Sequence, residues 1–321
     1  MSDIITADRR MSEVIQLAKT VAQSKATVLI QGESGTGKEL VASLIHEHST
    51  RVNRPFVAIN CAAIPENLLE SELFGYERGA FTGAVSSKAG KFEFANGGTL
   101  LLDEISEMDI RLQAKLLRVI QQGEVDRIGG RKPIPVDVRI VATTNRNLGE
   151  CVKQGSFRED LFYRLNVVNL TLPPLRERVG DVKILSSHLM AEFSTKNSKT
   201  ITGFSAEALG VLETHIWPGN VRELINVIER SVITAPGDTI NVQDLCIERR
   251  DLTGQLTASL QEKADKSWNP GQTLNDIERN VILEALNYHQ GNRTHTAKAL
   301  GISIRTLRNK LAEYRVLGIN V

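Results

Sequence analysis

The chain has 321 residues, which is enough for two or three domains. Its 39 lysines and arginines nearly balance 38 aspartates and glutamates, so no global charge marks a partner and any basic patch must be local. No apolar run approaches membrane-spanning length and no signal peptide follows Met1, while the three cysteines (Cys61, Cys151 and Cys246) lack metal-like spacing. We therefore expect a reduced, cytoplasmic protein with no membrane partner.

The first predicted elements are a helix from Asp8 to Ser24 and a short buried strand over Thr27–Ile30. An amphipathic helix follows after a glycine-rich segment, GESGTGKE, which consists of Gly32, Glu33, Ser34, Gly35, Thr36, Gly37, Lys38 and Glu39. Strand, glycine loop and helix form the context of a phosphate-binding loop, whose N–H groups and lysine hold phosphates. Where serine or threonine usually contacts magnesium, this chain has Glu39. The alternative is a glycine turn without a ligand, and the flanking elements favour a nucleoside triphosphate site.

Two later strands are predicted to bring polar groups to the same sheet edge. The strand over Pro55–Ile59 ends at Asn60, and the apolar run from Gly98 ends at Asp103 and Glu104. In open α/β sheets ligands bind at this edge. Beside a phosphate loop, Asp103 can hold magnesium and Glu104 can polarise a water for attack on the γ-phosphate. Paired acids also occur as plain helix caps, but the upstream loop favours the catalytic interpretation.

Between these strands, a helix predicted over Leu68–Phe74 runs into an unusual loop. The loop contains two glycines, two alanines, one aromatic residue and one hydroxyl, in the order Gly79, Ala80, Phe81, Thr82, Gly83 and Ala84. Such a segment cannot build a core. It is either a mobile surface turn or a loop that contacts a partner, because an exposed phenylalanine at a loop tip often marks one. The residues alone leave both interpretations open.

The next elements complete a doubly wound sheet. A helix is predicted over Ile110–Gln122, and a hairpin over Glu124–Val136 turns at Gly129 and Gly130. A strand over Val138–Ala142 then delivers Thr143, Thr144 and Asn145 to the ligand edge. Strands that alternate with helices imply a mainly parallel sheet, so the predicted fold class is α/β.

A pair of arginines, Arg158 and Arg164, lies on or beside a helical turn before the last predicted strand, Val167–Leu170. They are either a solvated face with local ion pairs or, in an oligomeric ATPase, groups that reach a neighbour's γ-phosphate. Helices between 181 and 247 form a small lid, in which Trp217–Asn220 caps a helix with Arg222 in its first turn. The polar stretch 249–271 is a predicted linker.

The last fifty residues are predicted to form three helices, and the third runs from Ser303 to Tyr314. On that helix Ile304, Leu307 and Leu311 are expected to face the core. The candidate DNA-binding residues lie on or near its outer face: Arg293, Ser303, Arg305, Thr306, Arg308, Asn309 and Lys310. The net charge of residues 291–321 is +5. A basic helix often only faces solvent and binds no partner. Here the tight turn at Gly301 and Ile302 favours a helix-turn-helix motif that binds DNA.

Taken together, these residues resemble the NtrC family of bacterial enhancer-binding proteins, which are AAA+ activators of the sigma-54 RNA polymerase. GESGTGKE resembles the family's phosphate loop, Glu39 included, and GAFTGA over Gly79–Ala84 resembles its loop for engaging the sigma factor. The resemblance implies a contact loop rather than a mobile turn. It also implies four segments: an AAA+ α/β ATPase part over 1–175, a helical lid over 176–248, a linker over 249–271, and a Fis-like helix-turn-helix domain over 272–321.

The resemblance further implies a role for each matching residue. Lys38, Asp103 and Glu104 would serve ATP and Mg²⁺, with Asn60 as a switch that engages the catalytic glutamate. Thr144 and Asn145 would be the first sensor, and Arg222 the second. Arg158 and Arg164 would act as arginine fingers across subunits of a hexameric or heptameric ring. The hairpin at Gly129–Gly130 would support the GAFTGA loop.

The resulting prediction is an ATP-dependent activator that binds upstream double-stranded DNA and remodels the sigma-54 RNA polymerase closed complex. The wording of its last two helices most resembles activators of flagellar genes, within two-component signalling. No receiver domain precedes Asp8, so we expect either an excised piece or a member controlled by a separate partner. The alternatives are a DNA-binding repressor with a non-catalytic AAA+ assembly domain, and a DNA-translocating motor, which would leave GAFTGA unexplained.

Overall fold

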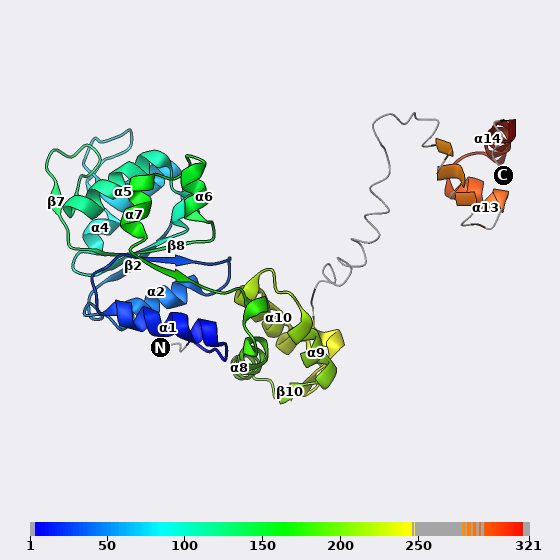
Figure 1. The fold of residues 1–321 in the computed structure, drawn as a ribbon, viewed down its shortest axis with the longest axis horizontal. Coiled ribbons are helices and arrows are strands. Elements are labelled where there is room, and N and C mark those ends of the chain that lie inside the picture. The colour runs from blue at the N-terminus through cyan, green and yellow to red at the C-terminus, as the bar shows by residue number, and fades with distance from the viewer. Residues whose placement is uncertain are drawn as a thin grey trace. The chain divides into compact units, whose positions relative to one another are not determined.

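The computed structural model describes residues 4–245, 247, 278–279, 281–283, 285–286, 289 and 292–316. The chain divides into two compact units, Met1–Ile247 and Glu248–Val321 (Figure 1). The predicted linker over 249–271 lies outside the described residues, and so does much of the first helix predicted for the second unit.

The centre of the first unit is a five-stranded parallel sheet with the strand order β2-β5-β8-β1-β9. Its strands are β1 (Val28–Gln31), β2 (Phe56–Asn60), β5 (Thr99–Asp103), β8 (Arg139–Thr144) and β9 (Val168–Thr171). The predicted α/β class and the parallel sheet are confirmed. Strand β8 extends two residues beyond the predicted end, because Thr143 and Thr144 pair with Ile30 and Gln31 of β1.

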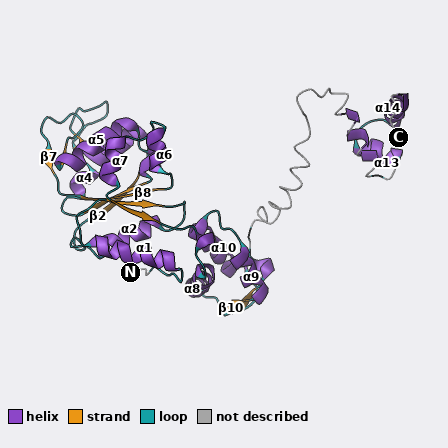
Figure 2. Ribbon diagram, in the orientation of Figure 1, coloured by secondary structure: helices purple, strands orange, loops and turns teal. Residues whose placement is uncertain are grey.

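Helices cover both faces of the sheet (Figures 1 and 2). One face carries α1 (Arg9–Ala22) and α2 (Lys38–Glu47). The other face carries α3 (Glu66–Phe74), α4 (Lys91–Phe94), α5 (Ile110–Gln122), α6 (Leu148–Lys153) and α7 (Glu159–Leu165). Side chains alternate along each strand, so Leu29 packs in the layer of α5 while Val28 and Ile30 pack in the layer of α1. This two-sided burial explains why the strands read as continuous apolar runs.

Two small antiparallel ladders stand beside the sheet. One joins β3 (Gly75–Tyr76) to β4 (Lys88–Ala89), and the other is the predicted hairpin, formed by β6 (Glu124–Val125) and β7 (Ile134–Pro135). A single parallel bridge between Tyr76 and Ile128 links the two ladders. The loop 79–84 and the hairpin therefore belong to one substructure.

The predicted helical lid follows the sheet. It consists of α8 (Asp181–Lys196), α9 (Ala206–Thr214) and α10 (Asn220–Thr234), with a short parallel pair of strands, β10 (Gly203–Phe204) and β11 (Thr239–Ile240). Three short 3₁₀ turns complete the first unit: η1 (Ile105–Glu107), η2 (Leu175–Glu177) and η3 (Val242–Asp244). The lid has its own core around Trp217, which is fully buried and donates its indole N–H to the carbonyl of Leu212 at 2.9 Å.

In the second unit the structure describes α13 (Arg293–Ala299) and α14 (Ile304–Val316). Their core contains Ile282, Ala297, Leu307, Leu311 and Tyr314. The prediction that Ile304 faces this core is wrong, since its side chain is 39% exposed. Ile304 has the right helical spacing, but it is the first residue of α14 and lies beyond the packed cluster. Among the described residues, no helix of either unit is long and apolar enough to cross a membrane.

Candidate nucleotide site

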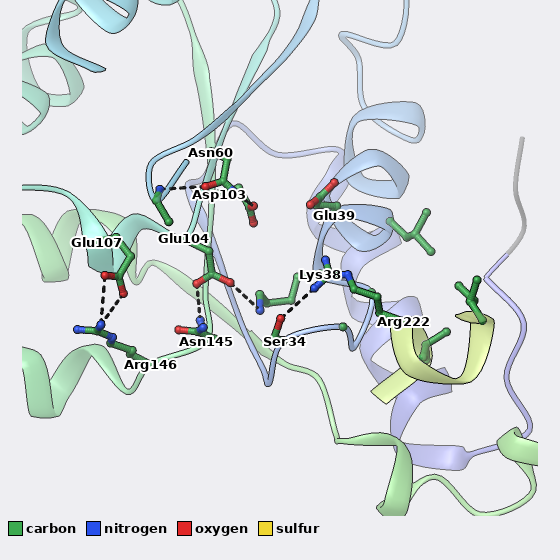
Figure 3. Close-up of a pocket in the computed structure, with 16 residues that line it drawn as sticks. Ser34, Lys38, Glu39, Asn60, Asp103, Glu104, Glu107, Asn145, Arg146 and Arg222 are labelled. Atoms are coloured by element: carbon green, nitrogen blue, oxygen red, sulfur yellow. Dashed lines mark hydrogen bonds and ion pairs between the residues drawn. The ribbon is translucent and has the colours of Figure 1, made fainter. Parts of the chain in front are cut away.

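A pocket of about 590 Å³ opens at the carboxyl edge of the sheet, between the phosphate loop and the lid (Figure 3). The register of the sheet brings this edge together, because Asn60 pairs with Asp103 across β2 and β5. Ten of the predicted site residues line the pocket: Ser34, Gly35, Gly37, Lys38, Glu39, Asn60, Asp103, Glu104, Asn145 and Arg222. Segments far apart in the sequence thus supply one cavity.

The glycine loop has the backbone that phosphate binding requires. Gly35 and Gly37 have φ angles of 78° and 96°, in the left-handed region that favours glycine. Lys38 is the first residue of α2, so its side chain and the helix N-terminus lie at the same end of the pocket. Its ammonium donates to the carbonyls of Gly32 (2.9 Å) and Glu33 (3.3 Å), and lies 3.2 Å from Glu104 Oε1.

Glu104 is held in a strained backbone conformation at the end of β5. Its φ is 52°, which is rare for a residue with a side chain and is often found at functional sites. Its Oε2 accepts a hydrogen bond from the backbone N–H of Asn145 at 2.9 Å, while Oε1 faces Lys38. The glutamate therefore has fixed partners from the start of α2 and from the residue that follows β8.

Asp103 is paired with Asn60, and this differs from the expected switch contact. Asn60 Nδ2 donates to Asp103 Oδ2 at 2.6 Å, and Thr143 Oγ1 donates to the other carboxylate oxygen. The expectation placed Asn60 against Glu104, whereas here Asn60 and Glu104 have separate partners. The side-chain oxygen of Asn60 also accepts from the N–H groups of Ala62 and Ala63, at 2.9 and 3.0 Å. Asn60 therefore ties the pocket to the segment that leads into α3.

The lid contacts the phosphate loop directly. Arg222 Nη1 donates to Ser34 Oγ at 3.0 Å, and the N–H of Val221 donates to the carbonyl of Gly35 at 3.0 Å. A Cβ on Gly35 would lie 2.3 Å from the carbonyl oxygen of Gly219, so only glycine fits this contact.

Asn220 is the most connected residue at this boundary. It is fully buried with φ 52°, donates to the carbonyl of Ser34 at 3.0 Å and accepts from the N–H of Leu175 at 2.7 Å. Its amide also donates to Glu33 Oε2 at 3.2 Å. One side chain at the start of α10 thus joins the phosphate loop to the first residue of η2.

Four of the predicted nucleotide-binding residues lie outside the pocket lining: Gly32, Glu33, Thr36 and Thr144. Glu33 turns toward Arg176, which donates to both carboxylate oxygens at 2.6 and 2.8 Å; this hydrogen-bonded pair holds the pKa of Glu33 below its ordinary value. Thr36 and Thr144 are buried and bond to neighbouring groups, Thr36 to the carbonyl of Glu33 and Thr144 to Ser106. These side chains shape the loop and the strand end rather than line the cavity.

Six further residues line the pocket, and the sequence did not single them out: Leu40, Ala62, Glu107, Arg146, Val221 and Ile225. Arg146 and Glu107 form an ion pair of 2.8 Å at one end of the cavity (Figure 3). Both residues could have been predicted from their positions in the sequence, because Arg146 directly follows Asn145 and Glu107 lies one 3₁₀ turn after Glu104. The apolar Leu40, Val221 and Ile225 follow motif residues on two helices.

The two candidate finger arginines lie away from this pocket. Arg158 occupies the N-cap position of α7 and pairs with Asp160 at 2.7 Å, which raises its pKa, and it is half-buried. Arg164 lies in the last turn of α7 and is exposed, and its side chain makes no hydrogen bond or ion pair within the described part of the chain. Neither residue lines the cavity of its own subunit.

The acidic groups of the pocket suit one kind of metal site. No cluster of three or more histidine, cysteine, aspartate or glutamate side chains that could hold a metal occurs among the described residues. Magnesium instead is typically bound by one or two carboxylates together with substrate phosphates and water. Asp103 presents one carboxylate beside the phosphate loop, and Glu39 also lines the cavity, so the residues fit a magnesium–nucleotide complex.

The loop 79–84 lies outside this pocket and is held by backbone bonds. The N–H of Gly79 donates to the carbonyl of Ala84 at 2.9 Å, and Gly79 and Gly83 have φ angles of 82° and 103°. Phe81 is 46% exposed, and its ring meets that of Tyr76 edge-on at 5.0 Å. The hairpin supports the loop, because a Cβ on Gly129 would lie 3.0 Å from the Cβ of Ala80.

In the second unit, the candidate DNA-binding side chains are exposed apart from one. Arg293, Ser303, Arg305, Thr306, Arg308 and Asn309 are exposed, whereas Lys310 is half-buried and pairs with Glu278 at 2.8 Å. Ser303 accepts the N–H of Thr306 at 3.0 Å and so caps the start of α14.

A parallel sheet with a phosphate loop, a strand-end Asp-Glu pair, a helical lid and a basic helical unit defines an AAA+ nucleotide-binding protein with a helix-turn-helix module. Three family models match the chain: the sigma-54 interaction domain over residues 4–171, the AAA+ ATPase lid domain over 176–262, and the bacterial regulatory protein Fis family over 273–314. The chain belongs to the NtrC family of sigma-54-dependent transcriptional activators.

Curated relatives are similar in sequence to this protein over nearly its whole length. The transcriptional regulatory protein FlbD of Caulobacter vibrioides is 53% identical, over 99% of this chain and 71% of FlbD. The response regulator protein FleR of Pseudomonas aeruginosa is 47% identical, over 96% of this chain and 69% of FleR. Among solved structures, NtrX of Brucella abortus in complex with ATP has a TM-score of 0.75 at 33% identity, and covers 98% of this chain and 69% of that one.

Proposed function

We propose that this protein hydrolyses ATP in the pocket between sheet and lid and uses the cycle to remodel the sigma-54 RNA polymerase closed complex. The observation that carries the proposal is the pair of contacts made by Glu104, to Lys38 at 3.2 Å and to the N–H of Asn145 at 2.9 Å. Lys38 would bind the β- and γ-phosphates as a point charge. A carboxylate that shares this lysine responds directly to the arrival of a phosphate group.

The residues would act in a fixed order. When phosphates enter, the ammonium of Lys38 turns from Glu104 and the loop carbonyls toward the incoming negative charge. Glu104 is then free to accept a proton from the attacking water, as a general base within hydrogen-bond distance. The N–H of Asn145, which holds Glu104 at 2.9 Å, limits how far the carboxylate can swing.

Asp103 and Glu39 are the residues that would hold Mg²⁺, together with phosphate oxygens. Bound there, the ion would neutralise charge that develops on the β- and γ-phosphates. Asn60 would leave Asp103 when that carboxylate takes a cation, because the Asp103 oxygen that receives its hydrogen bond is one of two available ligands.

Release of Asn60 offers a route from the pocket to the loop. Asn60 holds the N–H groups of Ala62 and Ala63, just before α3, and α3 ends at Phe74, directly before β3 and the loop 79–84. A rearrangement at Asn60 would therefore move α3 and raise Phe81 and Thr82 toward the sigma factor. The glycines at both ends allow a second loop shape at low backbone cost.

Arg158 and Arg164 would complete the pocket of the neighbouring subunit in a homo-oligomeric ring. Neither arginine lines the cavity of its own chain, and Arg164 is exposed while Arg158 is half-buried, which supports this placement in trans. The second unit would hold the ring on upstream double-stranded DNA through α14. The resemblance of its last helices to activators of flagellar genes stays a prediction.

The decisive experiment measures ATP hydrolysis per subunit against protein concentration, with and without sigma-54. The expected result is a rate that rises with concentration, because a site shared between subunits forms only in the ring. Glu104→Gln is the control, which should bind ATP and hydrolyse none. A repressor with a non-catalytic AAA+ domain would show no hydrolysis at any concentration, and a flat rate per subunit would contradict a shared site.

A further inference from the structure

The first residue of α14, Ile304, leaves an apolar side chain exposed on a polar surface. It is 39% exposed and stands outside the core cluster of this unit, which takes in Leu307 and Leu311 on the same helix. Its exposed neighbours in the first turn are Ser303, Arg305 and Thr306. A single surface isoleucine is ordinary in itself, so its meaning depends on where the helix holds it.

The turn before α14 fixes that position. Gly301, with φ 67°, follows α13, and the N–H of Ile302 then donates to the carbonyl of Ala297 at 3.0 Å while its side chain packs against the core. Ser303 caps the helix by accepting the N–H of Thr306 at 3.0 Å. Ile304 is thus held at the first helical position. In helix-turn-helix proteins the N-terminal residues of the second helix contact base edges in the major groove.

The chemistry of the groove selects the partner of an apolar side chain there. In the major groove the C5-methyl of thymine is the apolar group that distinguishes one base pair from the others. The exposed guanidinium groups of Arg305 and Arg308 on the same helix give the surface the positive charge that brings it to duplex DNA. We propose that Ile304 packs against the C5-methyl of one thymine and so contributes to base preference. The inference rests on the proposed DNA binding by α14.

The test removes the methyl from the DNA and the side chain from the protein. Duplexes that bind the full chain are selected from a randomised library, and each dT of a selected duplex is then replaced in turn by dU, which lacks only the methyl. Loss of one buried methyl contact should weaken binding about fourfold. At one position, we expect dU to weaken the unsubstituted protein by this factor and to leave Ile304→Ala unaffected.

Two further variants separate base reading from general DNA affinity. Ile304→Val keeps an apolar branched side chain and should retain the sensitivity to dU. Arg308→Ala should weaken all duplexes alike and also retain that sensitivity, since loss of a phosphate contact carries no base information.

Two results would overturn the inference. One is that no dU substitution weakens the unsubstituted protein, and the other is that the same substitutions weaken it and Ile304→Ala equally. If the library yields no preferred duplex at all, then α14 does not read DNA, and the proposed DNA binding fails together with the inference.

Discussion

In the nucleotide pocket, hydrogen bonds and ion pairs of the side chains fix the functional groups. Around residues 79–84, backbone hydrogen bonds fix the shape of the loop instead. Glu104, Asp103 and Asn60 are each fixed by named partners within hydrogen-bond distance. Within the described part of the chain, no side-chain hydrogen bond fixes Phe81 or Thr82, and the loop closes through the backbone pair of Gly79 and Ala84. Chemistry requires groups placed in advance, while a mechanical contact requires a segment with a second accessible shape. Substitutions in the two regions should therefore affect ATP hydrolysis very differently.

The largest loss of hydrolysis is expected from Arg164→Ala. Arginine fingers contribute on the order of 10³ to 10⁵ in rate, so this variant should bind ATP yet lose nearly all turnover. Mixing it with Glu104→Ala protein should restore some activity, because a mixed ring contains interfaces with both groups intact. Arg9→Ala, on an exposed arginine of α1, is the matched control. No recovery in the mixture would place the whole site within one chain.

Asn220→Ala should have the next largest effect, through ATP affinity rather than turnover. The substitution leaves the N–H of Leu175 and the carbonyl of Ser34 without their partner. The bond to the Leu175 N–H is buried, and an unpaired buried group costs about 1–3 kcal/mol. We expect ATP to bind about tenfold or more weakly, as measured by fluorescent nucleotide titration. Asn220→Gly separates the causes, since glycine relieves the φ of 52° and still lacks the amide. Normal affinity in both variants would show that the contacts of Arg222 with Ser34 and of Val221 with Gly35 connect lid and loop without Asn220.

Arg127→Met tests the support of the loop and should change hydrolysis by less than about twofold. Arg127 donates to Glu93 at 2.6 Å and to Glu77 at 3.0 Å, and thereby joins the hairpin to α4 and to the residue that follows β3. Methionine keeps the apolar stem but removes charged hydrogen bonds, each worth about 1.5–3 kcal/mol. Hydrogen exchange should quicken at the N–H groups of Glu77 and Ile128, which now bond across this junction. Unchanged exchange would show that the backbone bridge suffices.

The same ion pair predicts a modest dependence of stability on pH. Arg127 holds the pKa of Glu93 below its ordinary value of 4.5. A lowered folded-state pKa means that the stabilisation is complete above that ordinary value and is lost as pH falls through the lower, folded-state value. The free energy of unfolding should therefore decline more steeply in acid for the unsubstituted protein than for Glu93→Gln. Parallel pH profiles would contradict this.

The smallest effect on hydrolysis is expected from Thr82→Ala. Its exposed side chain lies outside the pocket, so ATP binding, turnover and DNA binding should stay near normal. The variant should nevertheless lose stable contact with sigma-54 in the presence of ADP and aluminium fluoride, and lose promoter opening. Thr82→Ser, which keeps the hydroxyl, is the control. Normal promoter opening by Thr82→Ala would remove the loop from the proposed mechanism.

The main elements of the site were predictable because each is a short continuous motif. The phosphate loop is one such motif and the Asp103–Glu104 pair is another, and each directly adjoins an apolar strand. The bond of Asn60 to Asp103, the ion pair of Arg146 and Glu107, and the turn of Glu33 toward Arg176 depend on three-dimensional packing, which no local spacing encodes. The position of Ile304 was mispredicted for a related reason, because helical spacing gives a direction around the axis but not whether core extends that far along it.

The bridge between Tyr76 and Ile128 bears on how this protein can be recombined with its relatives. The N–H of Glu77 donates to the carbonyl of Ile128 and the N–H of Ile128 donates to the carbonyl of Gly75, both at 2.9 Å, and a Cβ on Gly129 would lie 3.0 Å from the Cβ of Ala80. The loop and the hairpin therefore pack as a matched pair, although the loop ends at Ala84 and the hairpin begins only at Glu124. A chimera that imports only the loop should fold poorly at this junction. One that transplants 75–89 together with 124–136 should carry its partner preference intact.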